Sequence, residues 1–174
     1  MANIITIFFS VILGITNPSG ESNMNNQQNE ITTYYLIRHA EKDRSDSSNQ
    51  NPDLTKEGSA RAKKWAEVLK NVNLDAVYST NYNRTMQTAM PLVKMNKLEI
   101  LNYDTKNLNN EEFQKATKGK TVLVVGHSNT TPQLANAILG KRKHGDIDDK
   151  ENGALFIVQI LPNGETTSQV LYIN

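Results

Sequence analysis

From residue 32 onward, short runs of apolar residues alternate with longer stretches in which apolar residues recur every three or four positions. The short runs cover residues 34–37, 76–78, 98–101 and 121–125. Short apolar runs such as these, of which 98–101 is broken by Glu99, are typical of strands that are buried on both faces of a parallel sheet. The clearest of them is Thr-Val-Leu-Val-Val at 121–125, because three of its five residues are valine. The pattern therefore predicts four strands of a largely parallel sheet.

The first of the longer stretches predicts a helix that begins near Thr55. Threonine is a favourable residue for capping a helix, and Glu57 would lie in the first turn, where a negative charge is stabilising. The apolar residues that follow recur at helical spacing and form one stripe. That stripe comprises Ala62, Trp65, Leu69 and Val72. We expect it to pack against the sheet.

Three further helices are expected later in the chain. The next helix along the chain contains Met86 and Ala89, and Pro91 should bend or restart it. Residues 110–118 are weakly helical, and residues 132–139 form a helix that Gly140 ends. Helices that alternate with parallel strands in this order cover both faces of the sheet.

The chain ends in two more apolar stretches, at 154–161 and 169–172, which flank the Pro-Asn-Gly turn at 162–164. Such a turn between two strands predicts an antiparallel hairpin. The expected fold class is thus α/β: a three-layer sandwich with helices on both faces of a mostly parallel central sheet and a C-terminal antiparallel hairpin. We assign residues 31–174 to this single domain.

Residues 1–30 differ from the rest. The stretch 4–15 is apolar except for Thr6, Ser10 and Gly14, and a polar linker rich in Asn and Gln follows it. A run this short favours a signal peptide or a membrane-tethering segment over a full membrane span. We therefore expect the protein to be exported, periplasmic or membrane-tethered. The alternative is that 4–15 is a buried strand or helix of the domain and that the protein is cytoplasmic.

Composition narrows the chemistry. The chain has no cysteine, which excludes disulfides, thiol catalysis and metal sites built on thiolates. Only Glu21 and Glu30 are charged in the first thirty residues, so the remainder carries 19 basic and 16 acidic residues. This balance does not indicate a nucleic-acid binder. The mixed charges of 141–150, which include His144, are typical of a solvated surface loop.

Polar clusters follow three of the predicted strands, where the sites of open α/β sheets lie. Arg38 and His39 follow the first strand, Arg84 lies shortly after the second, and His127 follows the valine-rich strand. Arginine grips two oxygens of a phosphoryl group, and a neutral imidazole is a good nucleophile. Two arginines and two histidines together therefore favour phosphoryl transfer, which depends mainly on positioning and electrostatics.

At these residues the sequence resembles the histidine phosphatase superfamily, also called the phosphoglycerate mutase-like family. The resemblance is carried by four motifs in order: Leu-Ile-Arg-His-Ala-Glu at 36–41, Leu-Thr-Lys-Glu-Gly at 54–58, Arg-Thr-Met-Gln-Thr-Ala at 84–89 and Gly-His-Ser-Asn at 126–129. It implies a phosphohistidine on His39, with Arg38, Arg84 and His127 binding phosphate. The family's proton donor is a carboxylate after the third strand, and Asp104 is the first candidate here, with Glu41 and Glu99 as the others.

The preferred function is phosphomonoester hydrolysis without a metal or another cofactor. No metal-ligand pattern is visible, and Ser128 lacks the sequence context of a nucleophilic serine. The substrate would be a small phosphorylated molecule or a phosphoprotein. The alternatives are a degenerate member that binds phosphorylated ligands without turnover and, less favoured because the chain is short, a mutase of the phosphoglycerate type.

Overall fold

The structure is a computed structural model, and it describes residues 30–173. The stretch 4–15, for which we predicted export or tethering, lies outside these residues. The elements in chain order are β1 (Thr32–Arg38), α1 (Lys56–Val68), β2 (Ala76–Ser79), α2 (Asn83–Asn96), β3 (Ile100–Asn102), α3 (Glu111–Thr117), β4 (Thr121–Gly126), α4 (Thr130–Leu139), β5 (Ala154–Ile160) and β6 (Thr166–Tyr172). Within the described part of the chain, no helix is long and apolar enough to span a membrane.

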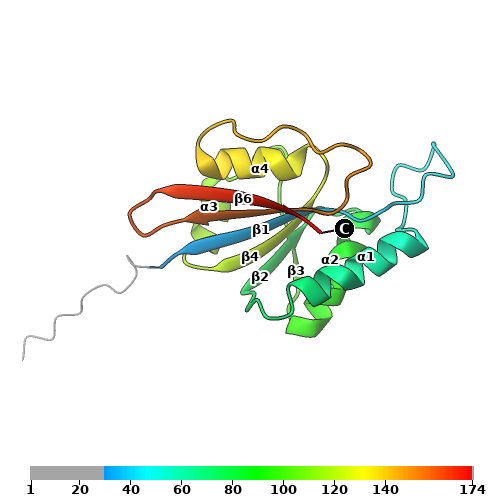
Figure 1. Cartoon of the computed structure of the whole chain (residues 1–174), viewed down its shortest axis with the longest axis horizontal. Coiled ribbons are helices and arrows are strands. Elements are labelled where there is room, and N and C mark those ends of the chain that lie inside the picture. Colours follow the sequence, from blue (N-terminus) through cyan, green and yellow to red (C-terminus); the bar gives the residue numbers. More distant parts are fainter. Residues whose placement is uncertain (1–29, 174) are drawn as a thin grey trace, which may run out of the picture.

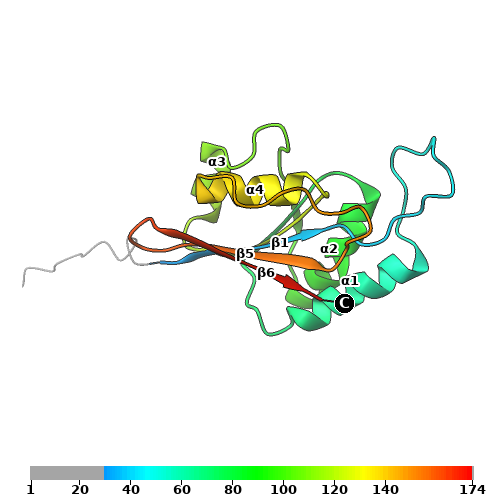
Figure 2. The ribbon, with the colours of Figure 1, turned by 45° about the horizontal axis from the view of Figure 1, so that its top comes forward.

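The six strands form one sheet in the order β3-β2-β4-β1-β5-β6. The four strands β3, β2, β4 and β1 run parallel, whereas β5 and β6 form the antiparallel hairpin that ends the chain. Helices α1 and α2 cover one face of the sheet, and α3 and α4 cover the other (Figures 1 and 2). The predicted three-layer sandwich, its mostly parallel sheet and its hairpin are confirmed.

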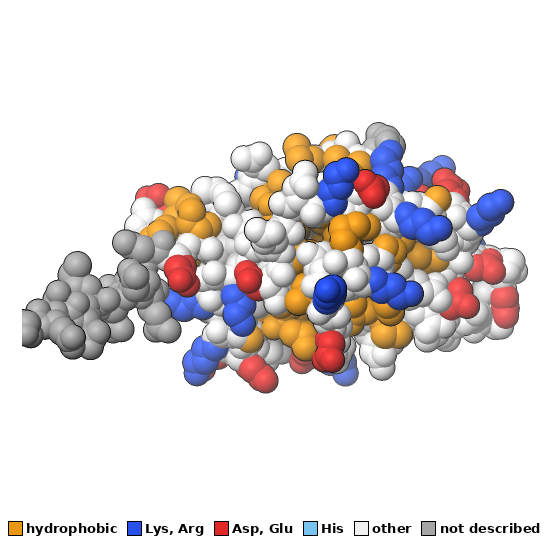
Figure 3. All heavy atoms as spheres, turned by 90° about the horizontal axis from the view of Figure 1, so that it is seen from below, with side chains coloured by type: hydrophobic (Ala, Val, Ile, Leu, Met, Phe, Trp, Pro, Cys, Tyr) orange, Lys and Arg blue, Asp and Glu red, His pale blue; other side chains and the backbone are white. Residues whose placement is uncertain are grey.

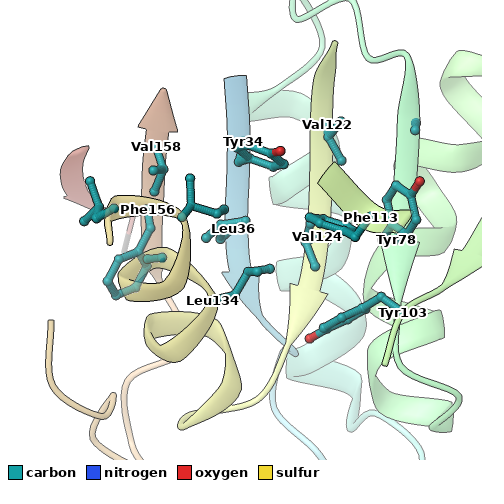
Figure 4. Close-up of a cluster of buried hydrophobic side chains, with 14 of the residues drawn as sticks. Tyr34, Leu36, Tyr78, Tyr103, Phe113, Val122, Val124, Leu134, Phe156 and Val158 are labelled. Atoms are coloured by element: carbon teal, nitrogen blue, oxygen red, sulfur yellow. The ribbon is translucent and has the colours of Figure 1, made fainter. Parts of the chain in front are cut away.

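Strand periodicity builds a separate core on each face of the sheet. In β4, Val122 and Val124 face α3 and α4, while Leu123 and Val125 face α1 and α2. The first core also holds aromatic side chains, among them Tyr34 and Phe113 (Figure 4). Both cores exclude water almost completely, so the sheet is a rigid platform whose strand ends are fixed.

Several local predictions need correction. Strand β3 begins at Ile100, two residues later than expected. Helix α2 runs through Pro91 without restarting, because a proline there removes one hydrogen bond that the neighbouring turns can do without. Val72 follows the end of α1 instead of extending its buried stripe. Asn129 lies at the cap position of α4, as expected, but its side chain makes no capping bond.

The surface agrees with the small net charge of the sequence. On the face that Figure 3 shows, basic and acidic side chains are interspersed with apolar ones, and neither sign forms a continuous field. Proteins that bind nucleic acid carry a continuous stripe of basic side chains, and this face carries none.

Candidate active site

The parallel strands bring the predicted residues to one edge of the sheet. Arg38 is the last residue of β1 and pairs in register with Gly126, the last residue of β4. The residues that follow each strand, His39 and His127, are therefore neighbours, and their ring centroids lie 5.5 Å apart. Helix α2 begins at the carboxyl end of β2 and carries Arg84 in its first turn. Residues that lie far apart along the chain thus meet at one site.

His39 is held in one orientation. The ring is 4% exposed, and its Nδ1 lies 2.8 Å from the carbonyl oxygen of Ala40. A carbonyl can only accept, so Nδ1 carries the hydrogen and Nε2 keeps its lone pair. The backbone is fixed as well, because the His39 N–H donates to Gly126 O at 2.9 Å and the Asn152 amide donates to His39 O at 2.8 Å.

The electrostatic setting keeps this ring neutral. Burial lowers the pKa of His39 to about 3, and the cations Arg38 and Arg84 act in the same direction against the bond to Ala40. A charged imidazole would be unfavourable beside two guanidinium groups when the residue itself is buried. At neutral pH, Nε2 of His39 is therefore an available nucleophile.

His127 takes part in a chain of hydroxyl groups. Thr85 Oγ1 donates to the carbonyl oxygen of Thr80 at 2.8 Å, so its bond of 2.9 Å with Thr80 Oγ1 uses the Thr80 hydrogen. His127 Nε2, at 3.0 Å from Thr80 Oγ1, must then be the donor in that contact. Burial lowers the pKa of His127 to about 4, with Arg84 as the next cause. His127 thus offers a neutral N–H.

Arg38 is 2% exposed. Its guanidinium is hydrogen-bonded to the segment 148–151, which we call the strap. Its Nη1 donates to Asp148 O at 2.8 Å and to Glu151 O at 3.0 Å, and its Nη2 donates to the Asp149 carboxylate at 2.7 Å. Its Nε is buried without a partner. The strap therefore fixes the guanidinium and leaves its buried Nε–H for a ligand.

Arg84 is held differently. Its Cζ lies 4.3 Å from the ring centroid of Tyr82, a cation–π contact. Its Nε and Nη1 are buried and make no hydrogen bond. Buried donors without partners are rare in folded proteins, because losing water without a replacement bond costs free energy. The site therefore presents three guanidinium nitrogens without a partner, Nε of Arg38 and Nε and Nη1 of Arg84, whose N–H groups suit an oxyanion.

The comparisons with known proteins agree with this geometry. The family model of the histidine phosphatase superfamily (branch 1) matches residues 34–105, which include Arg38, His39 and Arg84. By this match, residues 34–105 belong to a histidine phosphatase superfamily domain. His127 lies beyond the matched residues, at the strand end that completes the site. No curated protein sequence matches the chain.

Solved structures of this superfamily share the fold. The protein histidine phosphatase SixA in complex with tungstate has a TM-score of 0.61 at 19% identity, covering 80% of this chain and 96% of its own. A mycobacterial glucosyl-3-phosphoglycerate phosphatase scores 0.62 at 12% identity, covering 83% and 100%. Phosphoglycerate mutase from Bacillus anthracis strain Sterne scores 0.61 at 15% identity, covering 83% and 94%. At these identities the likeness is one of fold.

The three candidate proton donors lie in different surroundings. Asp104 is exposed, follows β3 at the catalytic edge and accepts a hydrogen bond from the Lys106 N–H at 2.8 Å. It borders a cavity of about 260 Å³ beneath the loop that leads to α3. Glu99 precedes β3, so it lies at the opposite edge of the sheet. Glu41 is paired with Arg61 at 2.6 Å, and its other oxygen is buried without a partner.

The Leu-Thr-Lys-Glu-Gly motif supports the nucleophile loop. The Thr55 side chain caps α1 by accepting from the Gly58 N–H at 3.0 Å, and the Thr55 N–H donates to Glu41 O at 2.9 Å. Gly58 lies directly against the Glu41 backbone, where a side chain would have no room. This motif therefore positions the segment that begins at His39.

Sequence reasoning missed four residues that contact or surround the site: Tyr82, Lys42, Asp149 and Asn152. Tyr82 stands two residues before Arg84, just ahead of the motif at 84–89, and this proximity was the available signal. Lys42 lies close enough to Arg84 and His127 to act on their charges. Asp149 comes from the loop 141–150, which is exposed as expected, and Asn152 follows that loop; the two residues nevertheless bond to Arg38 and to the His39 carbonyl oxygen. No local pattern marked them.

In residues 30–173, no group of three or more His, Cys, Asp or Glu side chains could hold a metal ion.

Proposed function

We propose that this protein hydrolyses phosphomonoesters through a phosphohistidine formed on Nε2 of His39. The observation that carries the proposal is the set of three buried, unpartnered guanidinium nitrogens on Arg38 and Arg84 beside a neutral histidine. These donors match the oxygens of a phosphoryl group, and the histidine supplies the electron pair that attacks phosphorus.

The first step would be an in-line displacement. The lone pair of His39 Nε2 forms the N–P bond while the bond between phosphorus and the leaving oxygen breaks, and that oxygen takes up a proton. Arg38 and Arg84 hold the oxygens of the transferred group, and the Nε2–H of His127 turns from Thr80 to a third oxygen. Water then attacks phosphorus, the N–P bond breaks, and inorganic phosphate leaves with His39 regenerated.

Two arginines and a histidine N–H supply the positive charge that this displacement requires, so the reaction is proposed to proceed without a metal ion. The proton donor is proposed to be Asp104, which is the candidate that follows a strand at the catalytic edge. Glu41 is the alternative, because one of its oxygens has no partner. Glu99 is the weakest candidate, since it lies at the opposite edge.

The substrate is proposed to be a small phosphorylated molecule or a phosphoprotein. Solved relatives include a protein histidine phosphatase and a phosphatase of glucosyl-3-phosphoglycerate, and these names support both classes. A panel that contains para-nitrophenyl phosphate, an alkyl phosphate and a phosphohistidine peptide would separate them.

The test is to trap the intermediate. Protein quenched during turnover of radiolabelled substrate should carry acid-labile phosphate, and His39→Asn should abolish both the label and the release of phosphate. Ser128→Ala is the matched control, because Ser128 follows His127 and offers the other nucleophile type at this edge; it should retain the label. Label that persists in His39→Asn would refute the proposed nucleophile.

Two further arms separate the alternatives. Activity should survive prolonged treatment with EDTA, and a loss that magnesium or zinc restores would indicate a metal-dependent phosphatase instead. Wild-type protein that binds tungstate but neither turns over nor becomes labelled would be a binding protein without catalysis.

A further inference from the structure

The ring of Tyr82 contacts two members of the phosphate pocket. Its face lies 4.3 Å from Cζ of Arg84, and its ring centroid is 5.4 Å from that of His127, with the two planes nearly perpendicular at 86°. Tyr82 is also 41% exposed, so this large side chain is kept at the mouth of the site instead of in a core. An exposed aromatic ring with two catalytic-site neighbours calls for a functional explanation.

The backbone of Tyr82 is firmly placed. Its N–H donates to Thr80 O at 2.9 Å, and its carbonyl oxygen accepts from the N–H groups of Thr85 and Met86 at 3.1 and 3.0 Å. Tyr82 is thus the capping position of α2, and Arg84 lies two residues further along. The start of this helix sets the ring and the guanidinium side by side.

The two arginines of the pocket are held by different kinds of contact: hydrogen bonds and an ion pair for Arg38, and an aromatic ring for Arg84. Arg38 is held by the Asp149 carboxylate and two carbonyl oxygens, which occupy Nη1 and Nη2. No acidic side chain in residues 30–173 forms an ion pair with Arg84. An aromatic face attracts a guanidinium through its quadrupole, so it neither takes an N–H donor nor cancels the positive charge.

We propose that Tyr82 is a positioning residue of the phosphate pocket. Its ring fixes the guanidinium of Arg84 and also contacts the ring of His127. Because an aromatic ring accepts no hydrogen bond from Nε or Nη1 here, both atoms and the full positive charge of Arg84 stay available to the oxyanion. The inference rests on the proposed function for the identity of the ligand, a phosphoryl group. Its consequence for oxyanion binding can be measured without turnover.

The experiment is a double-mutant cycle that measures the dissociation constant of tungstate by calorimetry. Tyr82→Leu removes the ring, Arg84→Gln removes the cation, and the double variant completes the cycle. We expect Tyr82→Leu to weaken tungstate binding about three- to thirty-fold, the range that cation–π contacts span. In the Arg84→Gln background the same change should have little further effect, because Tyr82 acts through Arg84.

Two variants control for loss of structure. Tyr82→Phe keeps the aromatic face and should bind tungstate as wild type does, which a role for the Tyr82 hydroxyl would not allow. Tyr172→Leu removes a tyrosine that is 63% exposed on β6, outside the pocket, and should leave the affinity unchanged. Kinetics with para-nitrophenyl phosphate should follow the same order, with the effect of Tyr82→Leu shared between KM and kcat.

The outcomes separate this inference from the proposed function. If Tyr82→Leu weakens binding equally with and without Arg84, or has no effect, Tyr82 does not position Arg84 and the inference fails alone. If the wild type binds tungstate but shows no turnover, hydrolysis fails and the cycle still decides the role of Tyr82. If the wild type does not bind tungstate, both are overturned.

Discussion

The substitution Gly58→Ala puts the link between helix α1 and the nucleophile loop to a quantitative test. Gly58 is the third residue of α1, and a Cβ built on it would lie 2.1 Å from Glu41 O and 2.9 Å from Glu41 C. These are backbone atoms of the residue that follows His39 and Ala40, so they cannot rotate away as a side chain would. Helix propensity alone predicts that alanine would stabilise α1 by about 1 kcal/mol.

The geometry predicts the opposite sign. The contact is more than about 1 Å shorter than van der Waals packing allows, so α1 and the loop must separate by roughly that distance. Overpacking of this kind costs about 1–3 kcal/mol. The separation also stretches the bond from Thr55 N to Glu41 O, worth about 1 kcal/mol. After the gain in propensity is subtracted, the free energy of unfolding should fall by about 1–3 kcal/mol.

Activity should fall further than stability, because the displaced segment begins at the nucleophile. A misplacement of about 1 Å can reduce turnover on the order of a hundred-fold. Urea denaturation gives the free energy of unfolding, and kcat/KM for para-nitrophenyl phosphate gives the activity. Gly145→Ala is the matched control: no atom lies within 4 Å of its added Cβ, so it should be neutral or stabilising by less than about 1 kcal/mol.

The reasoning would be refuted by a Gly58→Ala protein at least as stable as wild type with unchanged kcat/KM. Stability that falls equally in Gly145→Ala would show instead that the loss reflects glycine replacement in general.

Three other predictions follow from the site and the domain boundary. Because the folded pKa values of His39 and His127, about 3 and about 4, lie below the usual value near 6.5, the unfolded chain binds more protons below pH 6.5. The contribution of the two histidines to the free energy of unfolding should therefore be complete above pH 6.5. It should decline as the pH falls toward 4, by at most about 1.4 kcal/mol per pH unit for each histidine. Urea titrations should show a shallower decline in the double variant His39→Asn, His127→Asn, and an equal decline would contradict this. Asp104→Asn should slow an alkyl phosphate on the order of ten- to a thousand-fold more than para-nitrophenyl phosphate, whose leaving group needs no proton; if Glu41→Gln shows that difference instead, the donor belongs to the nucleophile loop. A chain that begins at Glu30 should fold and keep wild-type kcat/KM, since β1 starts at Thr32 and the apolar run 4–15 is proposed to serve export or tethering; an insoluble product would favour a run that is buried in the domain.

The sequence by itself determined the fold class, and it named the residues that are proposed to carry the chemistry. The apolar runs of β1 and β4, which are buried on both faces, and the capped start of α1 at Thr55 are local signals, because a strand or a helix is selected by neighbours a few positions apart. Arg38, His39, Arg84 and His127 could be named for the same reason. Each follows a strand, and parallel strands end at a common edge, so order along the chain already implied that the four residues meet.

Only the tertiary structure decided how these residues are held. Asp149 grips Arg38 across 111 positions of sequence, and Asn152 holds the His39 carbonyl across 113. The loop that carries both reads as an ordinary charged surface segment, since no spacing rule relates it to β1. The ring of Tyr82 is placed against Arg84 and His127 by the first turn of α2 packing at the ends of two strands. Hydrogen bonds and ring contacts depend on positions in space to within an ångström, and such positions are fixed by the packing of the whole sheet and its helices, which no local stretch of sequence encodes.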